Sequence, residues 1–322
     1  MKRSLGTIII LSLAALVGSA AWARVQSGTL SWLHDVAFAS ASKGFIVGSG
    51  GVFLETDDGG RTWKKGKSPS SDSLRQILFT NELNGWLLCE RDVYNRGSKA
   101  SSYLMRTTDG GETWDRSEFG EYGRERIAKI FFNDNGDGFA VGENGTILEF
   151  RDGNWTRQRS AFRFLFLDGG FSDASKAVIV GGGGSALVTD DGGETWTPSS
   201  FQTKPTGKLN AVFFRNRSTG WVVGASGAVY QTLNGGRSWR AQNSGVAAEL
   251  TDIEFINSAE GYAVGADGTI IHTPNAGNTW TLEASGIKHR LERIAVTGKT
   301  VIAVGFGGTI LTNAGSGPSM KK

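Results

Sequence analysis

The side chains best suited to chemistry in this chain are carboxylates and amides that recur in one short phrase. Thr-x-(Asp/Asn)-x-Gly-x-(Thr/Ser)-Trp occurs five times, and its third position holds Asp58, Asp109, Asp191, Asn234 and Asn275. Two carboxylates that meet can serve acid–base catalysis, but five near-identical copies cannot form one active site. In tight turns, Asp and Asn accept hydrogen bonds from backbone N–H groups while neighbouring glycines take positive φ. We therefore interpret these side chains as structural fasteners of a repeated turn, and we predict no catalytic residue.

Cations form the second set of interest. Arg126, Lys208 and Arg290 each stand immediately before the first residue of an apolar run, and Trp32 holds the same place in another copy. Arg binds a carboxylate through two parallel hydrogen bonds, whereas Lys acts as a point charge. Whether these side chains form one anion-binding site depends on the elements that carry them.

Those elements belong to a repeat of about 41 residues, marked by Trp63, Trp114, Trp155, Trp196, Trp239 and Trp280. In one copy, the apolar run 250–255 precedes Gly-Tyr-Ala-Val-Gly (261–265), then Gly-Thr-Ile-Ile (268–271), then the phrase that ends in Trp280. Four short strands punctuated by Gly, Asn and Asp are typical of one β-propeller blade. A single blade cannot bury its apolar face without neighbours, so the repeat predicts an all-β ring.

The number of copies predicts a seven-bladed β-propeller over residues 22–315. Six Val-Gly landmarks and a diverged copy around Trp86, with an insertion after Cys89, make seven. The seventh copy stops near Gly315 without its fourth strand. In four copies, the repeat Trp lies a constant number of residues before the end of the next inner strand. Trp22 lies the same number of residues before Phe38. We therefore predict that an N-terminal strand, from Trp22 to about Gln26, completes the last blade and leaves no open edge.

The two chain ends are predicted to lie outside the ring. Residues 1–21 combine Lys2 and Arg3 with an apolar stretch and small residues, a pattern typical of an export signal peptide. Its apolar stretch is short for a membrane span, which needs ~20 residues, and no Cys follows it to carry a lipid. We expect cleavage before Trp22 and no spanning helix afterwards, with an uncleaved anchor as the alternative. Residues 316–322 are expected to form a disordered tail.

Composition narrows the classes of function. The net charge of +3 is too small to predict a nucleic-acid-binding protein. Cys89 is the single cysteine, which excludes an intramolecular disulfide and favours a buried core residue. The three histidines show no metal-ligand spacing, so we predict no metal site and no cofactor. We expect a monomer, because closed rings often are.

The predicted ring brings the cations to one face. In a four-stranded blade, the loops between blades and the loops after the second strand share one face, and the Asp phrases lie on the other. The candidate partner-binding residues on the first face are Arg126, Lys208, Arg290, His289, Arg75, Arg163 and Trp32. Equivalent positions on a ring converge near its opening, where cations attract an acidic loop, a protein C-terminus or an anionic headgroup. The alternative is a solvated rim with local pairs such as Arg124 with Glu125.

The repeat phrase also resembles a known family. Thr-x-Asp-x-Gly-x-Thr-Trp is the Asp-box or BNR repeat, and with Gly-(Trp/Tyr/Phe)-x-Val-Gly upstream it resembles the photosystem II assembly factors called Ycf48 in cyanobacteria and Hcf136 in plants. The resemblance implies a non-catalytic, exported propeller that serves as an assembly or stability factor, or as an interaction scaffold, for a membrane or envelope complex. It implies a membrane or envelope protein partner with an acidic loop or tail, met by a basic patch. The implied location is the periplasm or the exterior, or the thylakoid lumen in a photosynthetic source.

Other classes of function stay open, because Asp boxes also occur in sialidases. A sialidase-like glycoside hydrolase needs a Tyr nucleophile, an acid/base aspartate and an arginine cluster. The tyrosines outside the repeat positions are Tyr94, Tyr103 and Tyr122, and the Arg-Ile-Pro signature of sialidases is absent near the start. A carbohydrate-binding propeller is a related alternative, and a purely structural subunit of an envelope complex is a third.

Overall fold

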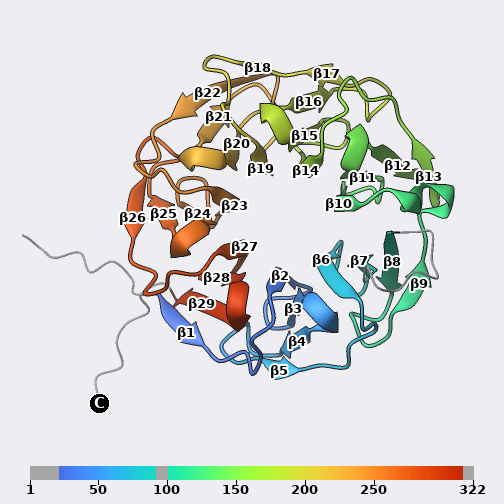
Figure 1. The fold of residues 1–322 in the computed structure, drawn as a ribbon, viewed down its shortest axis with the longest axis vertical. Coiled ribbons are helices and arrows are strands. Elements are labelled where there is room, and N and C mark those ends of the chain that lie inside the picture. Colours follow the sequence, from blue (N-terminus) through green and yellow to red (C-terminus); the bar gives the residue numbers. More distant parts are fainter. Residues whose placement is uncertain (1–21, 92–100, 315–322) are drawn as a thin grey trace, which may run out of the picture.

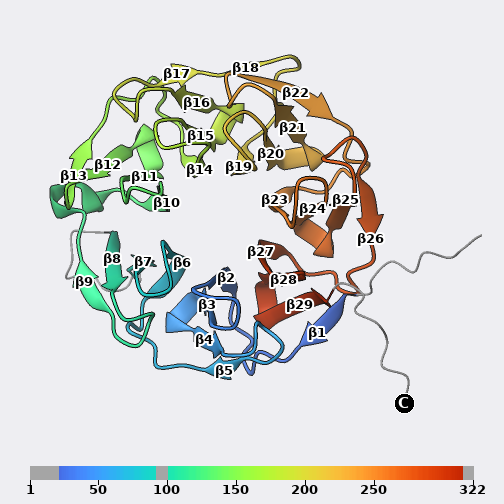
Figure 2. The ribbon, with the colours of Figure 1, turned by 180° about the vertical axis from the view of Figure 1, so that it is seen from behind.

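The structure is a computed structural model that describes residues 22–91 and 101–314. These residues form seven sheets arranged radially around a common axis (Figure 1), and Figure 2 shows the ring from behind. The predicted seven-bladed β-propeller is confirmed. The predicted signal peptide (1–21), the middle of the insertion after Cys89 (92–100) and the predicted tail (316–322) lie outside the described residues.

Each of the first four blades runs from an inner strand to an outer strand in chain order. Blade 1 contains β2 (Leu33–Phe38), β3 (Gly44–Gly48), β4 (Phe53–Thr56) and β5 (Lys64–Lys65). Blade 2 contains β6 (Ser73–Phe79), β7 (Gly85–Glu90), β8 (Ser102–Thr107) and β9 (Asp115–Ser117). Blade 3 contains β10 (Ile127–Phe132), β11 (Gly138–Gly142), β12 (Ile147–Arg151) and β13 (Asn154–Arg157), and blade 4 contains β14 (Phe166–Phe171), β15 (Ala177–Gly181), β16 (Ala186–Thr189) and β17 (Thr197–Pro198).

The last three blades follow the same order, with one addition. Blade 5 contains β19 (Leu209–Phe214), β20 (Gly220–Gly224), β21 (Val229–Thr232) and β22 (Ser238–Gln242), and β18 (Ser200–Phe201) pairs with β22 in parallel. Blade 6 contains β23 (Leu250–Phe255), β24 (Gly261–Gly265), β25 (Ile270–Thr273) and β26 (Thr281–Glu283). Blade 7 contains β27 (Leu291–Thr297), β28 (Thr300–Gly305), β29 (Thr309–Ala314) and β1 (Ala23–Val25). The fifth strand of blade 5 was not predicted.

Short 3-10 turns complete the blades. They connect the second and third strands of blades 1 and 3–7, as η1 (Ser49–Gly51), η3 (Glu143–Gly145), η4 (Gly182–Gly184), η5 (Ala225–Gly227), η6 (Ala266–Gly268) and η7 (Phe306–Gly308). A further turn, η2 (Gly120–Arg124), lies between blades 2 and 3. In residues 22–91 and 101–314, no helix has the length and apolar character of a membrane span.

The ring closes through its N-terminal strand, as predicted. β1 pairs antiparallel with β29, with Val25 opposite Ile310, and the two strands lie side by side in Figure 1. Trp22 itself precedes the strand and is buried against blade 6. Its ring meets Tyr262 edge-on at 5.8 Å, and its Nε1–H donates to Glu283 Oε2 at 2.8 Å. The first described residues therefore join blade 7 to blade 6 as well as completing blade 7.

The hydrophobic core is divided among the junctions between blades. In the described part of the chain, seven apolar clusters each join two neighbouring blades. Between blades 5 and 6, for example, Trp221 stacks on Phe255 with ring centroids 4.0 Å apart, and Trp280 meets Phe255 edge-on. Because every blade depends on its neighbours for burial, the ring holds the inner strands, and the side chains on them, in fixed relative positions.

Candidate functional site

The residue before each inner strand is held in place by the turn after the second strand. The backbone N–H groups of Glu143, Ala225 and Phe306 donate to the carbonyls of Arg126, Lys208 and Arg290 at 2.9–3.0 Å. The landmark glycine packs on the same carbonyl. A Cβ on Gly142, for example, would lie 2.1 Å from the carbonyl oxygen of Arg126, so this position admits no side chain. The repeated Val-Gly landmark thus fixes the backbone from which the three cations project.

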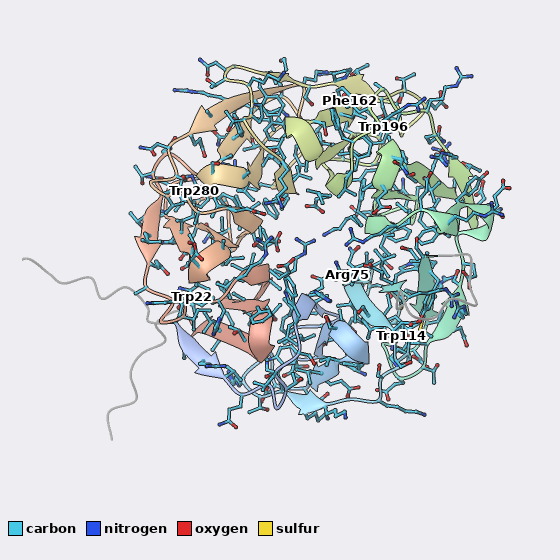
Figure 3. The ribbon with its side chains drawn as sticks, in the orientation of Figure 1. Trp22, Arg75, Trp114, Phe162, Trp196 and Trp280 are labelled. Atoms are coloured by element: carbon cyan, nitrogen blue, oxygen red, sulfur yellow. The ribbon has the colours of Figure 1, made fainter. Side chains whose placement is uncertain are left out.

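Four cations from four blades line the mouth of the central opening on this face, and a fifth, Arg293, lies deeper and pairs with Asp35 at 3.8 Å. Arg75, Arg126, Lys208 and Arg290, which we call the basic cluster, border a cavity of about 200 Å³. Figure 3 places Arg75 at the inner edge of the ring. Arg126, Lys208 and Arg290 occupy equivalent places in blades 3, 5 and 7, whereas Arg75 lies on inner strand β6 of blade 2. The structure therefore brings these three cations together with Arg75, which is also among the predicted partner-binding residues.

The basic cluster carries its own counter-charges. Glu90 bridges Arg75 and Arg126, at 3.0 and 3.1 Å from their Nε atoms. Glu249 bridges Lys208 at 2.9 Å and Arg290 at 3.3 Å. A third carboxylate, Glu292, pairs with the Nε atom of Arg290 at 2.8 Å.

Four cations thus face three carboxylates, which leaves one positive charge in excess. Glu90 contacts Arg75 and Arg126 through their Nε atoms. The terminal nitrogens of Arg126 have no hydrogen-bond partner among the described residues. Because a guanidinium carries five N–H donors, the cluster keeps donors that can bind a further anion.

A buried histidine orients one member of the cluster. His34 Nε2 lies 3.1 Å from Arg75 Nη1 and 2.9 Å from Ser49 Oγ. Burial, reinforced by the charges of Arg75 and Arg293, lowers the pKa of His34 to about 3. The imidazole is therefore neutral at ordinary pH, and Nε2 accepts a hydrogen bond from Arg75. Nothing in the sequence indicates that the inner strands of blades 1 and 2 place His34 against Arg75.

Below the mouth, charged side chains hold neighbouring blades together. Asp35 accepts a hydrogen bond from the N–H of Ile77 in blade 2, at 3.0 Å. The carboxylates of Asp168 and Asp252 accept equivalent hydrogen bonds, at 2.9 Å, from backbone N–H groups on the inner strands of blades 5 and 7. Burial raises the pKa of Asp252 to about 6, and burial together with the charge of Asp252 raises the pKa of Glu254 to about 8. This deeper layer is structural, so the anion-binding chemistry stays at the mouth.

The other candidate residues of this face are less close to the cavity. Trp32 and His289 lie beside the basic cluster and contact Phe306, with ring centroids 5.6 and 5.9 Å apart. Arg163 lies on the loop before blade 4, exposed to solvent, and does not border the cavity. The structure thus groups six of the seven candidates and leaves Arg163 apart.

The Asp phrases form the turns of the opposite face. Asp58 accepts hydrogen bonds from Thr56 Oγ1 at 2.7 Å, Thr62 N at 3.0 Å and Thr62 Oγ1 at 2.6 Å. Asp109 and Asp191 make the same contacts, while Asn234 and Asn275 accept the backbone bond and donate their amide to the hydroxyl. The hydrogen bonds from Thr62 lower the pKa of Asp58 to about 2. Each of these side chains is occupied by its own turn.

One of the three candidate nucleophiles of the sialidase alternative, Tyr103, is buried. Tyr103 is 1% exposed, and its hydroxyl donates to Asp72 Oδ2 at 2.8 Å while the Arg116 guanidinium covers its ring at 3.9 Å. Burial raises the pKa of Tyr103 well above its usual value, so neither access nor ionisation suits nucleophilic attack. Tyr122 is partly buried and packs against the core between blades 2 and 3, and Tyr94 lies outside the described residues.

The remaining reactive side chains are structural in character. Cys89 is fully buried between blades 1 and 2, as predicted, and burial raises the pKa of its thiol to about 12. In the part of the chain that the structure describes, no three His, Cys, Asp or Glu side chains come close enough to hold a metal ion.

Comparison with known proteins gives consistent matches. The family model described as "Photosynthesis system II assembly factor YCF48" matches residues 14–92 and 149–233, about half of the chain. The Arabidopsis thaliana chloroplastic photosystem II stability/assembly factor HCF136 is 26% identical over 282 residues, which cover 76% of this chain and 65% of that protein, less than two thirds of its length.

Two solved structures share the fold. YCF48 from Cyanidioschyzon merolae superposes with a TM-score of 0.72 at 20% identity, covering 91% of this chain and 98% of its own. A structure described as YCF48 bound to D1 peptide superposes with a TM-score of 0.75 at 18% identity, covering 93% of this chain and 97% of its own.

Proposed function

Because this chain belongs to the Ycf48 family of photosystem II assembly factors, we propose that it is a non-catalytic assembly or stability factor that captures a segment of a protein partner at its basic cluster. The names of its relatives describe assembly and stability, and one solved relative is described as bound to a peptide. The observation that carries the proposal is the convergence of Arg75, Arg126, Lys208 and Arg290 on one opening. The proposed partner is a membrane or envelope protein with an acidic loop or tail.

Capture rests on charge-assisted hydrogen bonds. A carboxylate of the partner can accept two parallel N–H donors from a guanidinium whose Nε edge is already held by a glutamate. Glu90 and Glu249 each bridge two cations and hold them oriented before the partner arrives, which reduces the entropy lost on binding. The excess positive charge selects acidic segments and speeds their encounter.

The proposed place of action is the periplasmic or lumenal side of a membrane. The predicted signal peptide directs export, and the relative from Arabidopsis is described as chloroplastic. We propose that the exported ring acts as a monomer and meets its partner at the membrane surface through the loop face.

Charge reversal tests this proposal. We expect that Arg126→Glu, Lys208→Glu and Arg290→Glu together abolish recovery of a membrane protein that the full chain co-purifies from envelope extracts of its source cells. The matched control reverses three exposed cations away from the mouth, Arg61, Arg240 and Lys299, which form no ion pair among the described residues. Circular dichroism and thermal unfolding establish that both variants keep the ring. Equal recovery by the two triple variants would contradict the site.

A further inference from the structure

Four rings form a continuous strip beside the basic cluster. We call His34, Trp32, Phe306 and His289, in this order, the aromatic strip. The ring centroids of Trp32 lie 5.6 Å from those of both His34 and Phe306, and Phe306 lies 5.9 Å from His289. Trp32 and Phe306 are 36% and 48% exposed. Large exposed aromatic side chains in contact with one another are typical of binding surfaces.

The strip does not belong to the core beneath it. The apolar cluster between blades 7 and 1 is built from Leu33, Val36, Ile302 and Val304, among others, and includes neither Trp32 nor Phe306. Leu30, two residues before Trp32, is a further exposed apolar side chain, at 85%. A stability role would have placed these rings among the buried residues of the junction.

One end of the strip contacts the basic cluster, and the other end is adjacent to it in the chain. His34 accepts a hydrogen bond from Arg75, and His289 directly precedes Arg290. The backbone N–H of Phe306 donates to the carbonyl of Arg290 at 3.0 Å. A ligand carboxylate on Arg75 or Arg290 therefore has the rings of Trp32 and Phe306 within reach of the neighbouring side chain of the same ligand.

We propose that the aromatic strip is an apolar subsite for a leucine-like side chain next to the acidic residue that the basic cluster binds. This inference rests on the proposed function and narrows its partner to an extended acidic segment with an aliphatic residue adjacent to a carboxylate. Charge complementarity commits the occupant to such a segment, because an uncharged apolar peptide gains nothing from the four cations. The strip supplies specificity, since an acidic segment without the apolar residue leaves the two exposed rings uncovered.

The test uses two fluorescein-labelled synthetic peptides and fluorescence anisotropy with the full chain. One peptide is Gly-Ser-Leu-Glu-Glu-Leu-Glu-Glu, and in the other both Leu residues are replaced by Ser. We expect the Leu peptide to bind about tenfold more tightly, as burial of one aliphatic side chain predicts. Phe306→Ser and Trp32→Ala should each reduce this preference to about threefold or less, because each should weaken binding of the Leu peptide more than binding of the Ser peptide.

The control variant is Phe164→Ser. Phe164 is 50% exposed and belongs to the loop before blade 4, so its removal should leave both affinities as they are. Equal binding of the two peptides by the unmodified chain, or equal loss of both in Phe306→Ser, overturns the subsite. If the unmodified chain binds both peptides equally, and charge reversal of Arg126, Lys208 and Arg290 abolishes that binding, the proposed function stands without the subsite. Absence of binding by both peptides overturns the proposed function and the subsite with it.

Discussion

Removal of one internal carboxylate should make the basic cluster a stronger anion receptor. Glu249 accepts from Lys208 at 2.9 Å, from Asn210 Nδ2 at 2.9 Å and from Arg290 at 3.3 Å. Burial raises the pKa of Glu249, but the hydrogen bond from Lys208 and the charge of Arg290 outweigh it, so the pKa lies below its usual value. Glu249 is therefore ionised at neutral pH. Glu249→Gln keeps a carbonyl oxygen for Asn210 and deletes the negative charge.

The size of the effect follows from the charge count. The substitution changes the excess at the mouth from one positive charge to two, as four cations then face two carboxylates. One unit charge at about 5 Å from a ligand carboxylate, in a mouth that is partly open to water, is worth about 1–1.5 kcal/mol. That corresponds to affinity about five- to tenfold tighter. The gain should shrink in 0.5 M salt, because screening shortens the range of the interaction.

Fluorescence anisotropy with a labelled glutamate-rich peptide measures this change. The matched control is Glu112→Gln, which adds the same charge to the protein but removes a carboxylate paired with Lys43 on the Asp-box face. Its effect on affinity should stay below about twofold, because Glu112 lies on the opposite face of the ring and salt screens charges over about 10 Å. Unchanged or weaker binding by Glu249→Gln, or the same gain in both variants, would refute the reasoning.

Three further predictions concern the stability of the ring. Asp191→Ala should lower the free energy of unfolding by about 2 kcal/mol in urea titrations, because Thr195 loses two hydrogen bonds to a charged acceptor, whereas Asp191→Asn should cost less than about 1 kcal/mol. Burial raises the pKa of Asp191, but the hydrogen bonds from Thr195 outweigh burial and lower the pKa to about 2. The contribution of Asp191 to the free energy of unfolding is therefore complete above its unfolded pKa of about 4 and fades towards pH 2. This loss at low pH should occur in the native chain and not in Asp191→Asn. Trp22→Ala should cost about 3 kcal/mol, measured by thermal unfolding, since it removes a buried ring and its bond to Glu283. Burial raises the pKa of Glu254 to about 8 in the folded chain, from about 4.5 in the unfolded chain. The protonated side chain therefore contributes fully to stability below about pH 4.5, and this contribution is lost as the pH rises through 8. Glu254→Gln should be more stable than the native chain at pH 9, by about 2 kcal/mol.

Much of the fold followed from spacing, because a propeller repeats one local pattern. The Val-Gly landmark and the Trp phrase indicated seven blades, and the position of Trp22 indicated closure of the last one. The extra strand β18 was not foreseen, since it depends on the path of one longer loop rather than on a repeated pattern. Trp22 proved to pack on Tyr262, outside the strand, because its ring reaches the next blade.

The candidate site was only partly visible in the sequence. Equivalent positions in the repeat brought Arg126, Lys208 and Arg290 together in advance of the structure. The bridging roles of Glu90 and Glu249 were not visible, because each depends on the distance between two neighbouring blades. Phe306 stands where other blades have Ser, Glu, Gly or Ala, and only the structure shows that its ring turns outward onto Trp32.

The position of a bound acidic peptide is the most direct measurement of how this propeller recognises a partner. A crystal structure of the full chain with a glutamate-rich peptide should show a peptide carboxylate on the guanidinium groups of Arg75, Arg126 or Arg290, at the mouth of the channel. A peptide seated on the Asp-box face, or along the outer edge of a blade, would contradict capture by the basic cluster.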